Sequence, residues 1–350
     1  AILQPQIPHY REEFFSGLFK ELKFDLFSFE DSSEDRKHLK QAAINYDLLK
    51  IVKLWRFKWY NPVRFLLKYD LVVIPGELSY LTNWVLLVTS FILRKNIIIW
   101  GHGLNYSRLK PISFGYKLMY FLSSSAIFYT EKEMRFYRKI FPNKKFSFLN
   151  NTIAIDANTI NESYQNAGRD SLKKKHNITH RKIFISCYRF TNPDRRDDEL
   201  FKLFSKCSIQ NLDVGFIIIG VGDLKPNFEG LNNVYDYGEL YNAQVKLELF
   251  QLSDFYLQLG WTGLSIVEAL AHKKPIVTLR RSKETKQSVE YHYLRNKYNA
   301  IIMNNISGFD KVLAINPNKI GQLSENAFLT YTKELQMKHM INNFKCHCNG

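Results

Sequence analysis

Short apolar runs alternate with longer helical patterns along almost the whole chain, and this alternation restricts the fold more than any other feature. Strands are expected at 2–4, 24–29, 71–74, 97–100, 126–129 and 146–149, and again at 182–187, 214–219, 234–235, 253–258, 276–278 and 300–303. Helices are expected at 11–22, 80–93, 116–122, 131–139, 198–204, 244–250 and 264–271, with one or two closing helices over 324–344. Short buried strands that alternate with helices are typical of a parallel, doubly wound α/β sheet.

The length and the apolar content predict two such sheets. A chain of 350 residues with 45% hydrophobic residues can bury two cores, so we expect two Rossmann-like domains that face each other across a cleft. The first is expected over 1–155 and the second over 156–322, with closing helices over 323–350 that pack back toward the first domain. Residues 158–180 are polar and lack a clean apolar period, so a linker and a surface loop are predicted there.

The formal net charge of +16 predicts a polyanionic partner: a nucleic acid, an anionic membrane surface or a phosphorylated substrate. The four cysteines are too few and too unevenly placed for a disulfide framework, which favours a reducing, cytoplasmic setting. The Cys346-His347-Cys348 cluster lacks the second pair of ligands of a zinc site, so no metal is expected. No signal peptide is expected at the amino end, and Pro75 interrupts the apolar window 71–93, which argues against a spanning helix.

The stretch from Gln258 to Thr278 combines a buried strand, a glycine turn and the start of a helix. Gly260 and Gly263 let the backbone bend sharply and approach a ligand closely. The free N–H groups and the positive dipole end that follow suit a phosphate or diphosphate. Glu268 falls about one turn into the helix, where its carboxylate would accept hydrogen bonds from a pair of sugar hydroxyls. The chemistry is therefore predicted in this stretch.

Several segments resemble, in the same order, the motifs of one enzyme family. Residues 150–156 resemble an N-G-I-D segment, 216–223 an I-V-G-x-G-P segment, and 258–278 a G-F-G-L-x-x-x-E-A-M-A-x-G-x-P-V segment, with Tyr188-Arg189-Phe190 closing the first strand of the second domain. In this order they resemble the donor-binding domain of the GT-B glycosyltransferases, especially the family 4 group that is related to glycogen synthase and mostly retaining. In the amino half, residues 4–11 and 99–103 resemble segments of bacterial polysaccharide-assembly transferases.

The chain departs from the family pattern at three places. The family usually carries two glutamates eight positions apart, whereas here the first position is Gly260 and Glu268 alone remains. Lys273 stands where the family has a glycine, and the glycine-rich loop often found after the first strand is absent. The missing first carboxylate leaves open an altered choice of donor sugar or a weakened activity.

The resemblance implies which residues bind the donor. Arg189 and either Arg195 or Arg196 would face the diphosphate, because a guanidinium binds phosphate oxygens in a bidentate way. The alternative for the Arg195-Arg196 pair is a solvated run of self-paired charges. Further donor-binding candidates are Gly222, the backbone of Thr262, Gly263 and Leu264, and the carboxylate of Glu268. Glu268 would bind the ribose hydroxyls, and its alternative is an ordinary exposed helix residue.

On the acceptor side, the resemblance implies a role for His102, which lies at a strand end between two glycines. A histidine there would hydrogen-bond a hydroxyl or stabilise charge near the donor sugar. The alternative is a turn histidine that bonds local backbone. His9 and Arg11, in the loop after the first strand, are further acceptor-side candidates. In a retaining reaction the leaving phosphate can take the acceptor proton, so no general base is assigned.

Aromatic and basic residues interleave around Trp55, Arg56, Lys58 and Trp59. Their rings suit a membrane interface and their charges suit anionic headgroups, which predicts a docking surface of a peripheral enzyme on the inner face of the membrane. The alternative is that the rings belong to the core and the cations extend outward.

The resulting hypothesis is a Leloir-type hexosyltransferase without a cofactor or a metal. It would move a sugar from UDP or GDP to a bacterial surface glycan of the capsule or lipopolysaccharide type, carried on a polyprenyl diphosphate. Two alternatives remain open. One is a GT-B protein without transferase activity, either a nucleotide-sugar epimerase or a non-catalytic partner. The other is a basic nucleic-acid-binding protein, although the cations are spread over both halves and no known binding module is visible, so no nucleic acid is expected.

Overall fold

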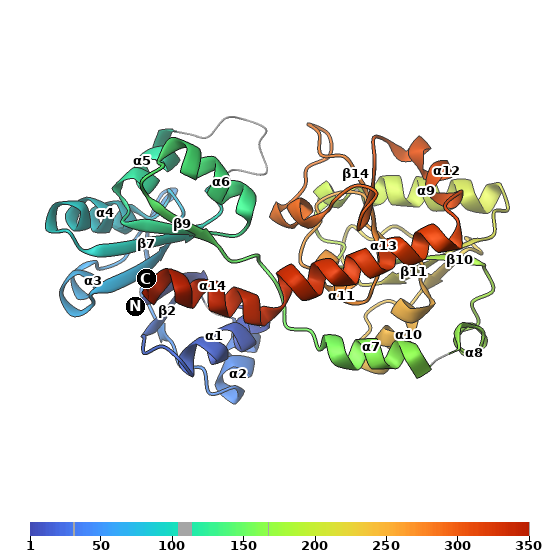
Figure 1. Ribbon diagram of the computed structural model, residues 1–350, viewed down its shortest axis with the longest axis horizontal. Coiled ribbons are helices and arrows are strands. Elements are labelled where there is room, and N and C mark those ends of the chain that lie inside the picture. The colour runs from blue at the N-terminus through green and yellow to red at the C-terminus, as the bar shows by residue number, and fades with distance from the viewer. Residues whose placement is uncertain (31, 104–113, 167, 350) are drawn as a thin grey trace. The chain divides into compact units, whose positions relative to one another are not determined.

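The computed structural model describes residues 1–30, 32–103, 114–166 and 168–349, which fall into two compact units. Unit 1 comprises residues 1–103, 114–154 and 336–349, and unit 2 comprises residues 155–166 and 168–335. Each unit has its own sheet of parallel strands with helices packed on it (Figure 1). The predicted pair of parallel α/β sheets is therefore confirmed.

The sheet of unit 1 has the strand order β3-β2-β1-β6-β7-β8-β9. Its strands are β1 (Ile2–Gln6), β2 (Leu26–Glu30), β3 (Asp47–Leu48), β6 (Leu71–Pro75), β7 (Asn96–Gly101), β8 (Ser125–Phe128) and β9 (Lys145–Phe148). Its helices are α1 (Glu12–Phe19), α2 (Ser33–Gln41), α3 (Val63–Lys68), α4 (Leu81–Leu93), α5 (Phe114–Leu122), α6 (Glu131–Ile140) and α14 (Met337–Asn349). A separate antiparallel hairpin is formed by β4 (Val52–Leu54) and β5 (Phe57–Trp59).

Successive residues of the central strands of unit 1 point to opposite faces of the sheet, and each face has its own core. In β7, Ile97 and Ile99 pack on one face, and Ile98 and Trp100 pack on the other. The first core includes side chains of α3, α4, α5 and α6, and the second includes side chains of α1, α2 and α14. The C-terminal helix α14 thus completes a core that begins with β1, and both chain ends lie together in unit 1 (Figure 1).

The sheet of unit 2 has the strand order β12-β11-β10-β13-β14-β15. Its strands are β10 (Lys182–Cys187), β11 (Val214–Ile219), β12 (Val234–Asp236), β13 (Phe255–Leu257), β14 (Ile276–Leu279) and β15 (Ala300–Met303). Its α-helices are α7 (Ala157–Asn166), α8 (Arg169–Lys175), α9 (Asp197–Ile209), α10 (Ala243–Leu252), α11 (Ser265–Ala271), α12 (Phe309–Leu313) and α13 (Pro317–Thr330). The strand order reverses between β10 and β13, and ligands of such sheets bind at the carboxyl ends of the strands at that point.

Asparagine side chains start two of the helices of unit 2. Asn242 accepts a hydrogen bond from the backbone N–H of Val245 at the start of α10, at 3.0 Å. Asn316 does the same for Lys319 at the start of α13, at 2.9 Å, and Pro317 follows it at the first helical position. Such caps satisfy backbone N–H groups that have no partner within the helix. Within the described ranges, no helix combines the length and the apolar character needed to cross a bilayer.

The prediction of a linker and a loop over 158–180 is wrong, because most of α7 and all of α8 lie there. Asp156 starts α7 by accepting hydrogen bonds from the backbone N–H groups of Asn158 and Thr159. Both helices are polar and bury few apolar side chains, such as Ile160 and Leu172, so their apolar period is weak. The expected closing segment 323–350 is divided, since residues up to 335 belong to unit 2 and residues 336–349 to unit 1.

The end of α8 is attached to α10 through the buried carboxylate of Glu248. Lys175 Nζ lies 2.8 Å from Oε1 of Glu248, and His176 Nε2 lies 2.7 Å from Oε2. Gln244 Nε2 donates a further hydrogen bond to Oε1, at 3.1 Å. Burial raises the pKa of Glu248, but the hydrogen bonds from Lys175, Gln244 and His176 more than offset this and lower it to about 2. The ionised carboxylate therefore stabilises this part of unit 2.

We expect Glu248→Gln to reduce the free energy of unfolding by about 1.5–3 kcal/mol at pH 7, because hydrogen bonds to a charged group are lost. A carboxylate whose pKa is lowered on folding stabilises the protein at pH values above the pKa of the unfolded state. This stabilisation is lost as the pH falls toward the pKa of the folded state, which is about 2. In urea denaturation, the difference in free energy of unfolding between variant and parent should therefore be smaller at pH 4 than at pH 7. Glu229→Gln, at an exposed position, is the control. An equal difference at both pH values would contradict the assignment.

Candidate functional site

The candidate site of unit 2 lies at the carboxyl ends of β10 and β13, where the strand order reverses. Two loops meet there: residues 188–196 follow β10, and residues 258–264 follow β13. The backbone N–H of Gly260 donates a hydrogen bond to the carbonyl oxygen of Arg195, at 3.0 Å. The arginine-bearing loop and the predicted phosphate-binding loop are thus joined directly.

The buried side chain of Gln258 holds the second loop in place. Its Nε2 donates a hydrogen bond to the carbonyl oxygen of Trp261, at 2.9 Å, and its Oε1 accepts one from Ser265 Oγ, at 2.9 Å. Trp261 has a φ of 34°, so the backbone turns sharply at this residue. Gln287 adds a second support by accepting a hydrogen bond from the backbone N–H of Thr262, at 2.9 Å. The loop is therefore positioned by side chains before any ligand is present.

Gly260 has a packing reason to be glycine. A Cβ atom at this position would lie 2.3 Å from the carbonyl oxygen of Asp194 and 2.9 Å from Cγ of Arg196. A backbone oxygen at that distance would have to move. A side chain at position 260 would therefore displace either the loop at Asp194 or the backbone of residue 260. The close approach of the two loops therefore explains a glycine at this position.

The loop offers donors beyond Thr262. The N–H of Thr262 already donates to Gln287 in this structure. The N–H groups of Gly263 and Leu264 make no hydrogen bond to another described residue, and a Cβ at Gly263 would meet no atom within 4 Å. The hydroxyl of Thr262 is buried and likewise has no partner in the described ranges. The loop therefore has donors without a partner in the described ranges, and there is open space at the Cβ position of Gly263.

The two neighbouring arginines differ in what they contact. Arg196 donates a hydrogen bond to Thr285 Oγ1, at 2.8 Å, and lies 3.5 Å from Oε1 of Glu199, so it holds the loop together. Arg195 stacks its guanidinium on the ring of Tyr188, at 4.7 Å from the ring centroid. Its Nε and Nη1 atoms are buried and have no hydrogen-bond partner among the residues that the structure describes. Such donors are costly to leave unpaired, which makes Arg195 the better candidate for an anion.

Arg189 is exposed and makes no hydrogen bond or ion pair with any described residue. It follows directly after Tyr188 at the end of β10, on the same loop as Arg195. The structure therefore leaves the predicted cation at position 189 able to contact a ligand. Gly222 packs against this loop, because a Cβ there would lie 2.3 Å from the carbonyl oxygen of Phe190. Its observed role is to let the loop after β11 approach the loop after β10.

Glu268 lies in the first turn of α11, and its carboxylate is paired. Lys246 of α10 places its Nζ 2.6 Å from Oε1 of Glu268. Sequence reasoning missed Lys246, because a lysine on a helix carries no signal of the residue it will face. It also missed Gln258 and Gln287, although a glutamine at the end of an apolar strand is an unusual residue that could have been noticed.

The acceptor-side candidates all belong to unit 1. His102 follows β7, is exposed, and stacks on the ring of Tyr129 with 4.1 Å between ring centroids. His9 follows β1, and its Nδ1 lies 3.0 Å from Oδ1 of Asp35. Arg11 is buried, donates a hydrogen bond to Asn151 and stacks near the core aromatic rings, so its side chain is a structural cation of this unit.

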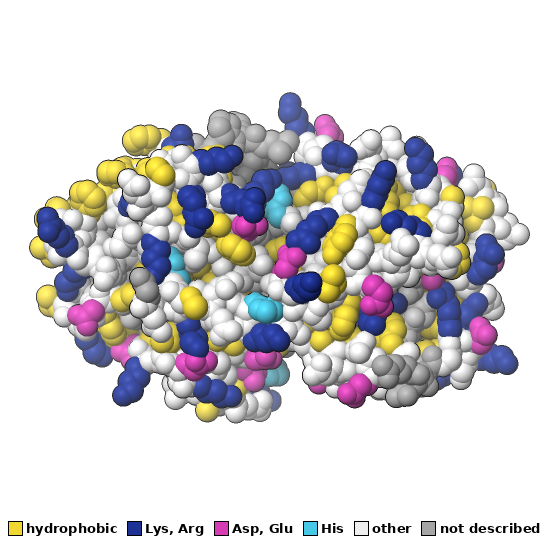
Figure 2. All heavy atoms as spheres, viewed as in Figure 1, with side chains coloured by type: hydrophobic (Ala, Val, Ile, Leu, Met, Phe, Trp, Pro, Cys, Tyr) yellow, Lys and Arg dark blue, Asp and Glu magenta, His cyan; other side chains and the backbone are white. Residues whose placement is uncertain are grey.

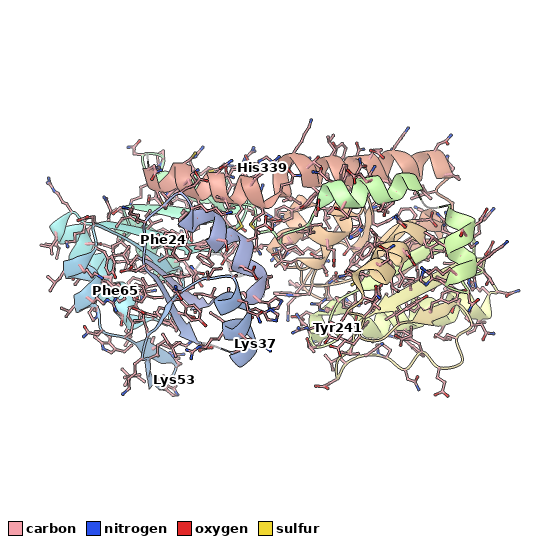
Figure 3. All side chains as sticks on the ribbon, turned by 90° about the horizontal axis from the view of Figure 1, so that it is seen from below. Phe24, Lys37, Lys53, Phe65, Tyr241 and His339 are labelled. Atoms are coloured by element: carbon pink, nitrogen blue, oxygen red, sulfur yellow. The ribbon has the colours of Figure 1, made fainter. Side chains whose placement is uncertain are left out.

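The predicted docking residues lie on the β4-β5 hairpin and differ in exposure. Trp55, at the turn, is 86% exposed, and Arg56 is exposed with its guanidinium 4.6 Å from the ring of Trp55. Lys58 and Trp59 are half-buried, and Lys58 Nζ donates a hydrogen bond to Tyr80 Oη at 3.3 Å. Figure 3 shows the neighbouring Lys53 projecting from unit 1. The turn of the hairpin, rather than the whole stretch, is therefore available for docking.

No group of three or more histidine, cysteine, aspartate or glutamate side chains in the described ranges is arranged to hold a metal ion. In the C-terminal cluster, the two ring nitrogens of His347 face Ser125 Oγ at 2.9 Å and Ser147 Oγ at 2.8 Å. His347 therefore attaches α14 to β8 and β9.

Comparison with known proteins gives a match in structure alone, since no family model and no curated protein sequence matches the chain. A glycosyltransferase from Rickettsia africae ESF-5 superimposes with a TM-score of 0.67 at 13% identity, covering 99% of this chain and 97% of that one. HepE of Anabaena, solved in complex with UDP, gives a TM-score of 0.67 at 14% identity, with 100% and 99% covered. The lipopolysaccharide outer core galactosyltransferase WaaB gives 0.63 at 12% identity, with 100% and 98% covered.

The chain has the GT-B fold. Similarity at these identities establishes the fold and not the activity, which has to be argued from the site. In this GT-B chain, the candidate site of unit 2 combines the exposed Arg189, Arg195 with two nitrogens that lack a hydrogen-bond partner among the described residues, the N–H groups of Gly263 and Leu264, and the carboxylate of Glu268.

We expect Gly260→Ala to reduce the free energy of unfolding by about 1–3 kcal/mol, because the added methyl group forces the loop at Asp194 to move. Gly263→Ala is the matched control in the same loop, since its methyl group would enter open space. Urea denaturation of both variants measures the difference. If Gly260→Ala is as stable as Gly263→Ala, the close approach of the two loops does not explain the glycine.

Proposed function

We propose that this protein is a glycosyltransferase that moves a hexose-type sugar from a nucleoside-diphosphate sugar, with UDP or GDP as the nucleotide. The observation that carries the proposal is Arg195, whose buried Nε and Nη1 atoms have no acceptor in the described part of the chain. Arg189 on the same loop and the free N–H groups of Gly263 and Leu264 supply further donors. The Anabaena protein HepE, which shares the fold over its full length, has been solved with UDP and with UDP-glucose, which supports a nucleotide-sugar ligand.

These residues suit the chemistry of the transfer. Breaking the bond between the sugar and the diphosphate builds negative charge on the leaving phosphate, and fixed cations and N–H groups stabilise that charge as it develops. Arg189 and Arg195 would supply this stabilisation without a metal ion. Glu268 would accept hydrogen bonds from the ribose hydroxyls and so fix the nucleoside. With retention of configuration, the leaving phosphate takes the proton of the acceptor, and a separate general base is not required.

The acceptor would be a bacterial surface glycan, bound by unit 1. His102 at the carboxyl end of β7 would contact the acceptor. His9 is a second candidate, because its side chain is exposed and Asp35 holds its ring at Nδ1. Burial raises the pKa of Asp35, but hydrogen bonds from Ser32 and from His9 outweigh it and lower the pKa below its ordinary value. An ionised carboxylate therefore faces His9.

A lipid-linked acceptor would bring the protein to the inner face of the membrane, and unit 1 has two surfaces that suit this. One is the exposed turn of the hairpin with Trp55 and Arg56. The other is an apolar face on α4 and α5, which includes Phe91, Ile92 and Phe121. Figure 2 shows hydrophobic side chains gathered over α4 and α5 on unit 1. Exposed apolar surfaces of this kind mark interaction sites.

The composition of the α4-α5 face favours a bilayer interface. Ile92 is 71% exposed, and the rings of Phe91 and Phe121 lie 5.9 Å apart, which makes the face continuous between the two helices. Neither helix carries an aspartate or a glutamate, and Arg94 and Lys117 are exposed beside the apolar side chains. Apolar side chains flanked by cations bind to the headgroup region of anionic membranes.

The donor proposal predicts that Arg189→Ala and Arg195→Ala each weaken nucleotide binding by about 1–3 kcal/mol, because each removes hydrogen bonds between charged groups. A thermal-shift screen of UDP, GDP, ADP, dTDP and CMP sugars identifies the nucleotide, and titration calorimetry then gives the affinities. Arg181→Ala, an exposed arginine of unit 2 outside the site, is the control. Unchanged affinity in both site variants would remove the assignment, and the absence of any nucleotide response would contradict a transferase. Binding without sugar transfer or release would favour the non-catalytic alternative.

The membrane proposal predicts that the protein co-sediments with vesicles of anionic lipid at low salt, and less at high salt. Phe91→Ser/Ile92→Ser and Trp55→Ser/Arg56→Ser should each lower the bound fraction, because apolar contact with the interface is lost. Ile209→Ser, which removes a single side chain of unit 2 that is 85% exposed, is the control. A bound fraction that is unchanged in both double variants would contradict docking through unit 1.

A further inference from the structure

The carboxylate of Glu268, which is the candidate ligand of the nucleoside, is paired with the ammonium group of a lysine. Lys246 reaches from the first turns of α10 and places Nζ 2.6 Å from Oε1 of Glu268. The two side chains are 27% and 21% exposed, so the pair is partly shielded from water and still partly accessible. A pair with this geometry restricts the orientation of the carboxylate.

The surroundings keep Lys246 charged and in place. Burial lowers the pKa of Lys246, but the neighbouring Glu268 carboxylate and the Cys187 thiol more than offset this and raise it above its ordinary value. Cys187 is the last residue of β10, two positions before Arg189, so Lys246 touches the strand that carries the arginine loop. The cap of Asn242 fixes the start of α10, four residues before Lys246. Lys246 therefore lies on a capped helix and contacts two other elements of unit 2, α11 and β10.

A bound nucleoside would change the electrostatics of this pair. It would cover the exposed side of Glu268 and remove water from a carboxylate, and such desolvation is costly unless an opposite charge compensates it. Lys246 supplies that charge from the protein side. An ionised carboxylate has room for more than one donor, so Glu268 can keep its contact with Lys246 and still accept hydrogen bonds from a ligand.

From this geometry we infer that Lys246 is a positioning residue for nucleotide recognition: it fixes the carboxylate of Glu268 so that the site distinguishes ribose from 2′-deoxyribose. The inference rests on the proposed function, since it needs a nucleotide at this site. Lys246 itself need not touch the nucleotide. Its effect passes through Glu268, and it should therefore appear in the discrimination between the two sugars rather than in overall stability.

The experiment compares the affinity for UDP with that for 2′-deoxy-UDP by titration calorimetry, and uses GDP and 2′-deoxy-GDP if the thermal-shift screen selects guanine. A hydrogen bond from a hydroxyl to a carboxylate gives the parent protein a preference for the ribonucleotide of about tenfold to a hundredfold. Glu268→Gln should reduce that preference strongly. Lys246→Met keeps the length of the side chain and removes its charge, and it should reduce the preference for the ribonucleotide to about threefold or less. Lys246→Arg, which keeps the charge, should retain most of the preference.

Lys175→Met is the matched control for the loss of an ion pair. It removes a lysine that pairs with Glu248 of the same helix α10, at 2.8 Å, and leaves Glu268 and Lys246 unchanged. Its preference for the ribonucleotide should equal that of the parent, whatever happens to its melting temperature. Combining Lys246→Met with Glu268→Gln should lower the preference no further than Glu268→Gln alone, because both substitutions remove the same interaction.

The outcomes separate this inference from the proposed function. If the parent binds no nucleotide, the proposed function fails and the inference fails with it. If the parent prefers the ribonucleotide and Lys246→Met keeps that preference while weakening both ligands equally, the donor site stands and the positioning role is overturned. If Glu268→Gln also keeps the preference, Glu268 is not the ribose residue and the inference is overturned at that point.

Discussion

The hydrogen bond between the N–H of Gly260 and the carbonyl oxygen of Arg195 joins the two loops on which the candidate site depends. It exists because residue 260 has no side chain, which lets the backbone at Asp194 approach to a distance that a Cβ would block. Since the contact is made by backbone atoms, it sets where Arg195 lies relative to the free N–H groups of Gly263 and Leu264. The glycine at position 260 is thus explained by a backbone contact within unit 2.

The cations near the candidate site fall into two groups, those that have partners within unit 2 and those that lack partners among the described residues. Arg196, Lys286 and Lys246 have acidic or hydroxyl partners within unit 2, and these partners tie loops and helices to one another. Arg189 and Arg195 lack such partners among the described residues. A basic protein contains many unpaired cations at its surface, where water solvates them cheaply. The unpaired nitrogens of Arg195 differ because they are buried, and burial without an acceptor is costly unless a ligand supplies one.

Unit 1 also has a parallel sheet, but the side chains in the loops that follow its strands differ from those of unit 2. Its sheet has one core on each face, and α14 closes the second core although it follows unit 2 in the chain. Histidines and a structural arginine occupy the loops after β1 and β7, whereas Arg189 and Arg195 occupy the loop after β10 in unit 2. The apolar face of α4 and α5 lies outside both cores, which is why packing within unit 1 does not explain it.

The sequence alone determined the class of fold, and it predicted where the candidate site lies. Short buried strands can be predicted from their runs of apolar residues. The order of the motifs indicated Arg189 and Glu268 as candidate site residues. The helices over 157–175 escaped prediction because they bury few apolar side chains and owe their position to contacts such as those of Glu248. Only the tertiary structure separated Arg195 from Arg196, paired Lys246 with Glu268 and explained Gly260. These properties depend on which atoms from distant parts of the chain meet, and the local sequence pattern does not contain that information.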